Sequence, residues 1–170
     1  MASRFNGKVS LVVGGANADE DHLLGFAGLS ALEIARDGGK VVIADIDDEA
    51  GQRSVKKMKD SGLSAEFVQM EVTSESDWDN AVAKTLGFFG KLDIMIMAAG
   101  IPDRGETIDS AEVEKWQRVM DVTNMGMFLG TRSVVKPMKK NGGGSIVLIS
   151  SMMARVVRDQ ANAYATSRAG

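Results

Sequence analysis

Short apolar runs alternate along this chain with longer segments of helical period, and this alternation limits the possible folds more than any other feature. Each run is nearly continuous rather than alternating, which is typical of strands covered on both faces. Such an order of strands and helices predicts right-handed crossovers and a parallel, doubly wound α/β sheet. The expected strands are Val9–Val13, Val41–Asp45, Glu66–Met70, Leu92–Met97 and Ser145–Ser150.

The segments between these runs predict five helices. Glycines end the first of them, and Ser74 begins the third with a pattern typical of a capping box. Trp78, Val82, Leu86 and Phe89 form the expected buried stripe of the third helix. The expected helices are Asp21–Asp37, Asp48 to about Gly62, a third after Ser74, Ser110–Lys139 and a fifth from about Gln160.

Composition excludes several functional classes. The 170 residues suffice for a single domain, residues 1–170, and a net charge of −3 offers no electrostatic footprint for nucleic acid. Without cysteine there is no disulfide or thiolate chemistry, and one histidine, His22, leaves no room for a His-rich metal site or a Ser-His-Asp triad. No signal peptide or membrane-length apolar stretch is visible, so a cytoplasmic protein that does not bind membranes is expected.

Glycines gather where the first strand should meet the first helix. Gly14-Gly15-Ala16-Asn17 follows the first run, and Gly25-Phe26-Ala27-Gly28 lies at the helix start. Glycines allow the backbone to turn tightly and approach a pyrophosphate, whose charge the helix N-terminal amides can meet. A purely structural turn would look similar.

The second strand ends in an acidic residue, Asp45, about 20 residues beyond the glycines, where a carboxylate can accept hydrogen bonds from an adenosine ribose. The same carboxylate would repel a 2′-phosphate, so NAD is favoured over NADP; a simple strand cap is the alternative. The acidic run Asp19, Glu20 and Asp21 is best explained by helix stabilisation, and it would weaken dinucleotide binding unless it points outward.

A catalytic pattern follows the fifth strand. Ser150-Ser151 stands at its end, Tyr164 is the only tyrosine, and Arg168 lies one helical turn beyond it on the same face. A fixed cation near a phenol favours the phenolate, which suits the tyrosine to general acid/base work. A serine hydroxyl within reach could hold a carbonyl or alcohol oxygen.

These motifs, in this order and spacing, are similar to those of the short-chain dehydrogenase/reductase family over essentially the whole chain. That family has a glycine turn, an acidic residue after strand two, an Asp-Val pair near adenine, Asn-Asn-Ala-Gly after strand four, and Ser with Tyr-x-x-x-Lys. The matching segments are Gly14-Gly15-Ala16, Gly25, Asp45, Glu71-Val72-Thr73, Ala99-Gly100, Ser145–Ser151 and Tyr164-Ala165-Thr166-Ser167-Arg168.

The resemblance implies a Rossmann-type sheet in the order 3-2-1-4-5 with helices on both faces. It also implies hydride transfer between NAD and a small-molecule alcohol or ketone, in a full-length form that is a homo-oligomer, either a dimer or a tetramer. Ser151 would position the reacting oxygen, Tyr164 would move its proton, Arg168 would hold the nicotinamide ribose, and Thr123 takes the position of the family's helix-four asparagine. The implied cofactor-binding residues are Gly14, Gly15, Asn17, Gly25, Phe26, Asp45, Ile46, Glu71, Val72, Ala99, Gly100, Tyr164 and Arg168.

Several residues depart from the family pattern. Arg168 replaces lysine and cannot deprotonate, Thr123 replaces asparagine with Asn124 adjacent, and Ala27 stands for the third glycine. Met97-Ala98 replaces two asparagines, and Val13 replaces the usual threonine. The long glycine loop is similar to that of the divergent enoyl-reductase branch, whereas the Tyr164–Arg168 spacing is that of ordinary members.

The chain ends directly after the tyrosine motif, so an N-terminal portion of a longer enzyme is expected, with its fifth strand as an exposed apolar edge. The leading hypothesis is an NAD-dependent alcohol dehydrogenase or ketone reductase. Two alternatives stay open: a dinucleotide-binding protein with weak or no catalysis, and a structural or partner-binding chain without cofactor.

Overall fold

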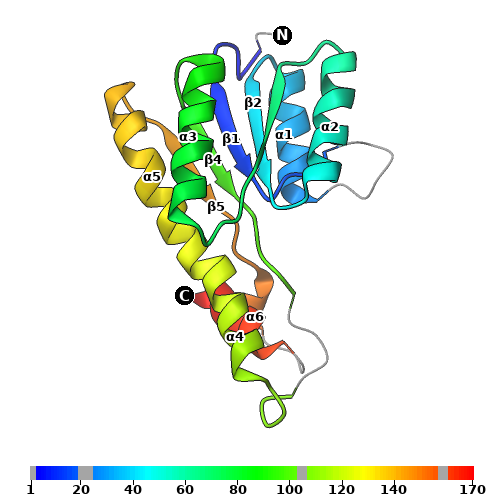
Figure 1. Ribbon diagram of the computed structural model, residues 1–170, viewed down its shortest axis with the longest axis vertical. Helices are drawn as coiled ribbons and strands as arrows, with labels where there is room; N and C mark the ends of the chain where they lie inside the picture. Colours follow the sequence, from blue (N-terminus) through cyan, green and yellow to red (C-terminus); the bar gives the residue numbers. More distant parts are fainter. Residues whose placement is uncertain (1–2, 19–24, 103–106, 157–160) are drawn as a thin grey trace.

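Five parallel strands form one sheet in the order β3-β2-β1-β4-β5 (Figure 1). The computed structural model describes residues 3–18, 25–102, 107–156 and 161–170. This order confirms the doubly wound, Rossmann-type prediction. The strands are β1 (Val9–Val13), β2 (Lys40–Asp45), β3 (Ala65–Gln69), β4 (Ile94–Met97) and β5 (Ser145–Leu148).

Helices cover both faces of the sheet (Figure 1). Because side chains alternate along a strand, β1 directs Leu11 and Val13 into one core and Val12 into the other. The core with Val12 is closed by α1 (Phe26–Arg36) and α2 (Asp48–Asp60). The opposite core is closed by α3 (Glu75–Phe89) and α5 (Gly126–Lys140).

Local capping explains where two of these helices begin. The Asp47 side chain accepts a hydrogen bond from the Ala50 N–H at the start of α2, and Ser74 accepts one from the Asp77 N–H at the start of α3, each satisfying an otherwise orphan amide. The described part of α1 begins at Phe26. The expected start at Asp21, with Asp19, Glu20 and His22, lies outside the described residues.

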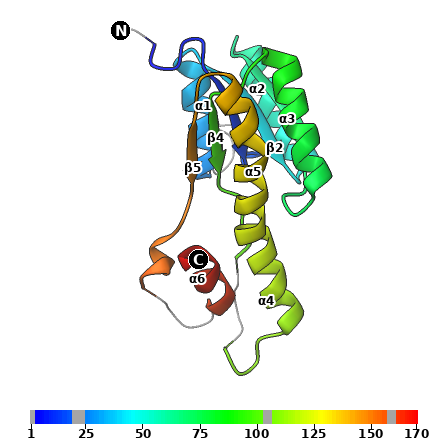
Figure 2. The same cartoon turned by 90° about the vertical axis from the view of Figure 1, so that its left-hand side faces the viewer.

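The fourth predicted helix, Ser110–Lys139, is three consecutive segments. α4 (Val113–Met120) is followed by a π-helical turn, η1 (Asp121–Met125), and then by α5. Val113, at the start of α4, is 74% exposed, because this end of the helix extends beyond the sheet (Figure 2).

Beyond the carboxyl ends of the strands, α6 (Asn162–Ala169) lies against α4 (Figure 2). A short 3₁₀ helix, η2 (Met152–Ala154), leads towards it from β5. Two strands are shorter than predicted: β4 begins at Ile94 rather than Leu92, and β5 ends at Leu148 rather than Ser150. Ser150 and Ser151 therefore belong to the loop that enters the α6 region. No helix among the described residues is long and apolar enough to cross a bilayer.

Candidate active site

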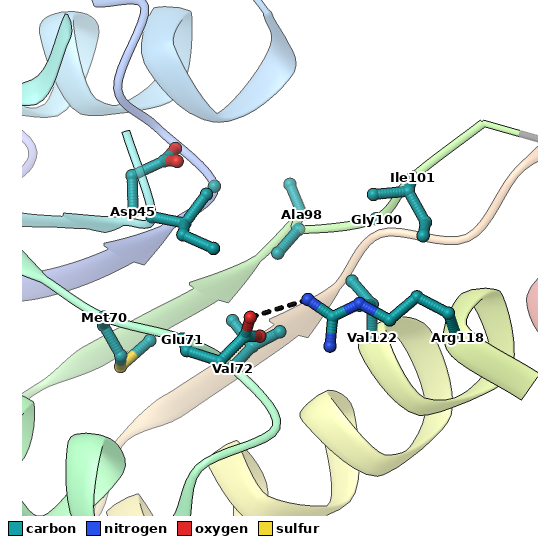
Figure 3. A pocket seen from close by; sticks show the side chains of 12 residues that line it. Asp45, Met70, Glu71, Val72, Ala98, Gly100, Ile101, Arg118 and Val122 are labelled. Atoms are coloured by element: carbon teal, nitrogen blue, oxygen red, sulfur yellow. Dashed lines mark hydrogen bonds and ion pairs between the residues drawn. The ribbon is translucent and has the colours of Figure 1, made fainter. Parts of the chain in front are cut away.

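Two cavities open at the carboxyl ends of the strands, where ligands bind in doubly wound sheets. The first has a volume of about 230 Å³ and lies beside Asp45, Glu71 and Val72 (Figure 3). The second, of about 680 Å³, is lined by Ser151, Tyr164 and Arg168 among others. Both cavities include Gly14 and Ala98 in their walls, so they meet beside the glycine loop.

The glycine loop lets backbones pass in close contact. Gly14 has φ +81° and accommodates the end of β4, because a Cβ there would lie 2.6 Å from the Ala99 nitrogen. Gly25 borders the second cavity, and a Cβ at that position would have no atom of the described residues within 4 Å. Gly25, the residue directly before α1, therefore leaves room for a ligand beside the helix N-terminus as far as the described residues go.

Gly28 is a structural glycine that the motif comparison did not single out. Ala27 was placed where the family has its third glycine, yet a Cβ on Gly28 would overlap the carbonyl of Asn17. Gly28 thus allows α1 to pack against the loop after β1. The sequence signal that could have identified Gly28 is its position, one residue after the place of the family's third glycine.

Asp45 lies at the end of β2 and lines the first cavity together with Ile46. Its Oδ2 accepts a hydrogen bond from the Ala16 N–H at 2.9 Å, and its Oδ1 accepts one from the Asp47 N–H at 3.2 Å. The carboxylate is therefore fixed against the glycine loop. Each oxygen keeps capacity for a further hydrogen bond.

Glu71 lies on the other side of the first cavity and is held by an arginine that sequence reasoning did not identify. Arg118 Nη2 donates to Glu71 Oε2 at 2.6 Å (Figure 3). Burial raises the pKa of Glu71, but hydrogen bonds from Arg118 and Thr73 outweigh it and hold this pKa below its ordinary value. Forty-seven positions separate the pair, so no local pattern could have revealed it.

The second cavity brings three of the predicted catalytic residues together. The Arg168 guanidinium carbon lies 4.9 Å from the centre of the Tyr164 ring. Its Nη1 donates to the Ile149 carbonyl at 2.9 Å, and its Nη2 lies beside Gly100, where a Cβ would overlap it. The cation is buried under the phenol ring rather than extended into solvent.

The serines after β5 connect this loop to α6. Ser150 Oγ donates to the Arg168 carbonyl at 2.7 Å. Ser151 Oγ accepts a hydrogen bond from the Met153 N–H at 3.2 Å, which caps η2 and fixes the hydroxyl on the cavity wall. The hydroxyl proton is still available for donation.

Three predicted site residues line neither cavity: Gly15, Asn17 and Thr123. Thr123 lies in η1, is fully buried, and its Oγ1 has no hydrogen-bond partner among the described residues. The adjacent Asn124 donates from Nδ2 to the Ser167 carbonyl at 3.0 Å, which ties η1 to α6. The other predicted residues line one or both cavities: Gly14, Gly25, Phe26, Asp45, Ile46, Glu71, Val72, Ala99, Gly100, Ser151, Tyr164 and Arg168.

Curated proteins with similar sequences are named as dehydrogenases. A 3-alpha-(or 20-beta)-hydroxysteroid dehydrogenase of Mycobacterium tuberculosis is 40% identical over 89% of this chain and 54% of that protein. A cyclopentanol dehydrogenase of Comamonas testosteroni is 34% identical over 97% of this chain and 63% of that protein. The chain thus spans between about half and two thirds of the length of these relatives.

Solved structures agree with the sequence comparison. A short chain dehydrogenase from Mycobacterium smegmatis superposes with a TM-score of 0.90 at 27% identity, covering 99% of this chain and 68% of that one. The family profile described as short chain dehydrogenase matches residues 8–170. Because this profile covers nearly the whole chain and the sheet order agrees with it, the chain belongs to the short-chain dehydrogenase family.

Proposed function

We propose that this chain is part of an NAD(H)-dependent oxidoreductase that interconverts a secondary alcohol and a ketone. The observation that carries the proposal is that the two cavities share Gly14 and Ala98 in their walls. One cavity ends at an acidic residue suited to a ribose, and the other holds a phenol, a hydroxyl and a cation. A nicotinamide dinucleotide would fit this pair of cavities, with its adenosine half in the first, its nicotinamide half in the second and its pyrophosphate between them.

The residues present fit such a dinucleotide. Among the described residues no atom lies within 4 Å of a Cβ on Gly25, so this residue leaves room for a pyrophosphate beside the start of α1. Asp45 would accept hydrogen bonds from the adenosine ribose and disfavour a 2′-phosphate, which supports NAD over NADP. Arg168 would hold the nicotinamide ribose in the second cavity.

The chain's own groups would handle the oxygen and its proton. In ketone reduction, Ser151 Oγ–H donates a hydrogen bond to the carbonyl oxygen, and the Tyr164 hydroxyl gives its proton to that oxygen as the alcohol forms. In alcohol oxidation the phenolate takes the proton back. Arg168, which lies against the Tyr164 ring, keeps its own charge throughout. When bound, the dinucleotide would supply the hydride to the substrate carbon in reduction and accept it in oxidation.

The test is Tyr164→Phe in the protein that carries this chain. We expect kcat with NADH and a panel of secondary ketones to fall by roughly 10²- to 10⁴-fold, because the proton donor is lost. The Kd for NADH, followed by its fluorescence, should change little and should be lower than that for NADPH.

The alternative is a dinucleotide-binding protein without efficient catalysis. It is favoured by Arg168 in place of lysine and by the buried Oγ1 of Thr123, for which the described residues offer no hydrogen-bond partner. In that case NADH would bind, and wild type would turn over no faster than Tyr164→Phe. Absence of saturable NADH binding would reject both functions.

We also propose that the full-length protein is a homo-oligomer and is located in the cytoplasm. Its substrate would be a small-molecule alcohol or ketone. The apolar side chains of Phe26 and Met152 on the second cavity support an apolar substrate.

A further inference from the structure

The first cavity contains one cationic side chain among the described residues that line it. Besides Asp45 and Glu71, the other residues of its wall are apolar or glycine, and Arg118 is the exception. A guanidinium in such a place either has a structural role or binds a ligand. Its surroundings distinguish the two.

Arg118 reaches the cavity from α4 and ends at Glu71 (Figure 3). Its Nη2 pairs with Glu71 Oε2 at 2.6 Å, and its Nη1 donates to Thr73 Oγ1 at 3.5 Å. The side chain is 47% exposed. The half-exposed guanidinium therefore forms part of the outer wall of a cavity whose other described lining residues, apart from Asp45 and Glu71, are apolar or glycine.

The hydrogen bonds of Glu71 are directed at this arginine and at its own loop. Its Oε1 accepts from the Thr73 N–H at 3.3 Å, while its backbone N–H donates to Asp77 Oδ2 at 2.9 Å. Asp77 is itself fixed by the Ser74 cap of α3. Glu71 is thus a firmly held brace with both carboxylate oxygens engaged.

We propose that the guanidinium of Arg118, braced by Glu71, covers the purine base of the dinucleotide and supplies a stacking surface for it. This inference rests on the proposed function and adds a residue to it. A guanidinium attracts the π-face of an aromatic ring, and every nucleobase has such a face. In this arrangement the stacked Arg118 guanidinium provides the affinity for the base. Glu71 positions Arg118 and does not itself hydrogen-bond to the edge of adenine.

The experiment measures the Kd of NADH and of its hypoxanthine analogue, which carries an oxygen in place of the adenine amino group. Arg118→Met keeps the stem but removes the charged plane, so we expect the Kd of both dinucleotides to rise about 5- to 30-fold. Arg118→Lys should not restore affinity, because lysine lacks the flat surface. Reduced nicotinamide mononucleotide, which has no purine base, should bind wild type and Arg118→Met equally.

Glu71→Gln tests the brace. We expect a smaller loss, equal for the two dinucleotides, and a double variant with Arg118→Met that binds no more weakly than Arg118→Met alone. Arg132→Met is the matched control, because Arg132 is 49% exposed and pairs with Glu75 at 2.7 Å away from both cavities. It should leave every Kd unchanged.

Three results would overturn the inference. They are an unchanged or tighter NADH Kd in Arg118→Met, a loss limited to the adenine dinucleotide, and a Glu71→Gln effect that adds fully to that of Arg118→Met. Each is distinguishable from failure of the proposed function, in which wild type itself would not bind NADH.

Discussion

Gly14 lies where the end of β1 passes the end of β4, and two independent constraints meet at this residue. Its φ of +81° is a conformation that L side chains rarely adopt, and the backbone of Ala99 occupies the place of a Cβ. The glycine loop is therefore specified by packing as well as by any ligand. A turn glycine that has a positive φ but no backbone close to its Cβ position would tolerate alanine better.

We predict that Gly14→Ala lowers the free energy of unfolding by about 3 kcal/mol or more, since the left-handed conformation alone costs roughly 1–2 kcal/mol and the overlap adds to it. Gly62→Ala is the control, because Gly62 has φ +77° and no atom in the described part of the chain lies within 4 Å of its added Cβ. Urea unfolding of both variants makes the comparison. If the two variants lost the same free energy of unfolding, the close contact with Ala99 would not contribute to the cost of Gly14→Ala.

At the scale of elements, Asp93 joins the beginnings of two strands and the end of a helix. Its Oδ2 accepts from the Val9 N–H at 2.8 Å at the start of β1, and its Oδ1 accepts from Asn141 Nδ2 at 3.2 Å after α5. Lys91 pairs with it at 2.9 Å. Burial raises the pKa of Asp93, but the Lys91 and Val9 hydrogen bonds outweigh it and hold this pKa below its ordinary value.

Because the pKa of Asp93 is lower in the folded protein than in the unfolded chain, its contribution to stability is complete at neutral pH. It is lost as pH falls below about 4, through the pKa of the folded state. We predict that Asp93→Asn lowers the free energy of unfolding by about 1–3 kcal/mol at pH 7 and by less at pH 3. Urea unfolding at the two pH values tests this, with exposed Asp79→Asn on α3 as control. A loss independent of pH would contradict the assignment.

At the scale of the whole molecule, the sheet has β3 at one edge and β5 at the other. The exposed residues of β5 include Val147 and Leu148, as predicted for an apolar edge. The described residues place no strand outside β5. Unpaired backbone groups beside apolar side chains favour pairing with another chain.

We predict that Val147→Lys reduces concentration-dependent association of this chain, since a lysine on an edge opposes strand pairing. Sedimentation velocity over a range of concentrations provides the measurement. Ile108→Lys makes the same apolar-to-lysine change at a residue that is 74% exposed and outside the sheet. If the two variants behaved alike, the edge would not be the site of association.

Much of the fold and of the candidate site could be predicted because the signals are local. A continuous apolar run such as Val9–Val13 identifies a buried strand, and Ser74 identifies a helix start from its own neighbours. Tyr164 and Arg168 are one helical turn apart, so their stacking follows from helix geometry. The glycine after β1 and the aspartate after β2 reach one edge because parallel strands end together.

Other features depend on how distant segments meet, and only the tertiary structure decided them. The π-helical turn at Asp121–Met125 interrupts a pattern that predicts a single helix, and Gly28 rather than Ala27 approaches Asn17. Arg118 reaches Glu71 only because α4 continues past the sheet to the loop after β3. Periodicity reports the environment of a residue along its own element, whereas such contacts depend on the relative placement of two elements, which no local pattern contains.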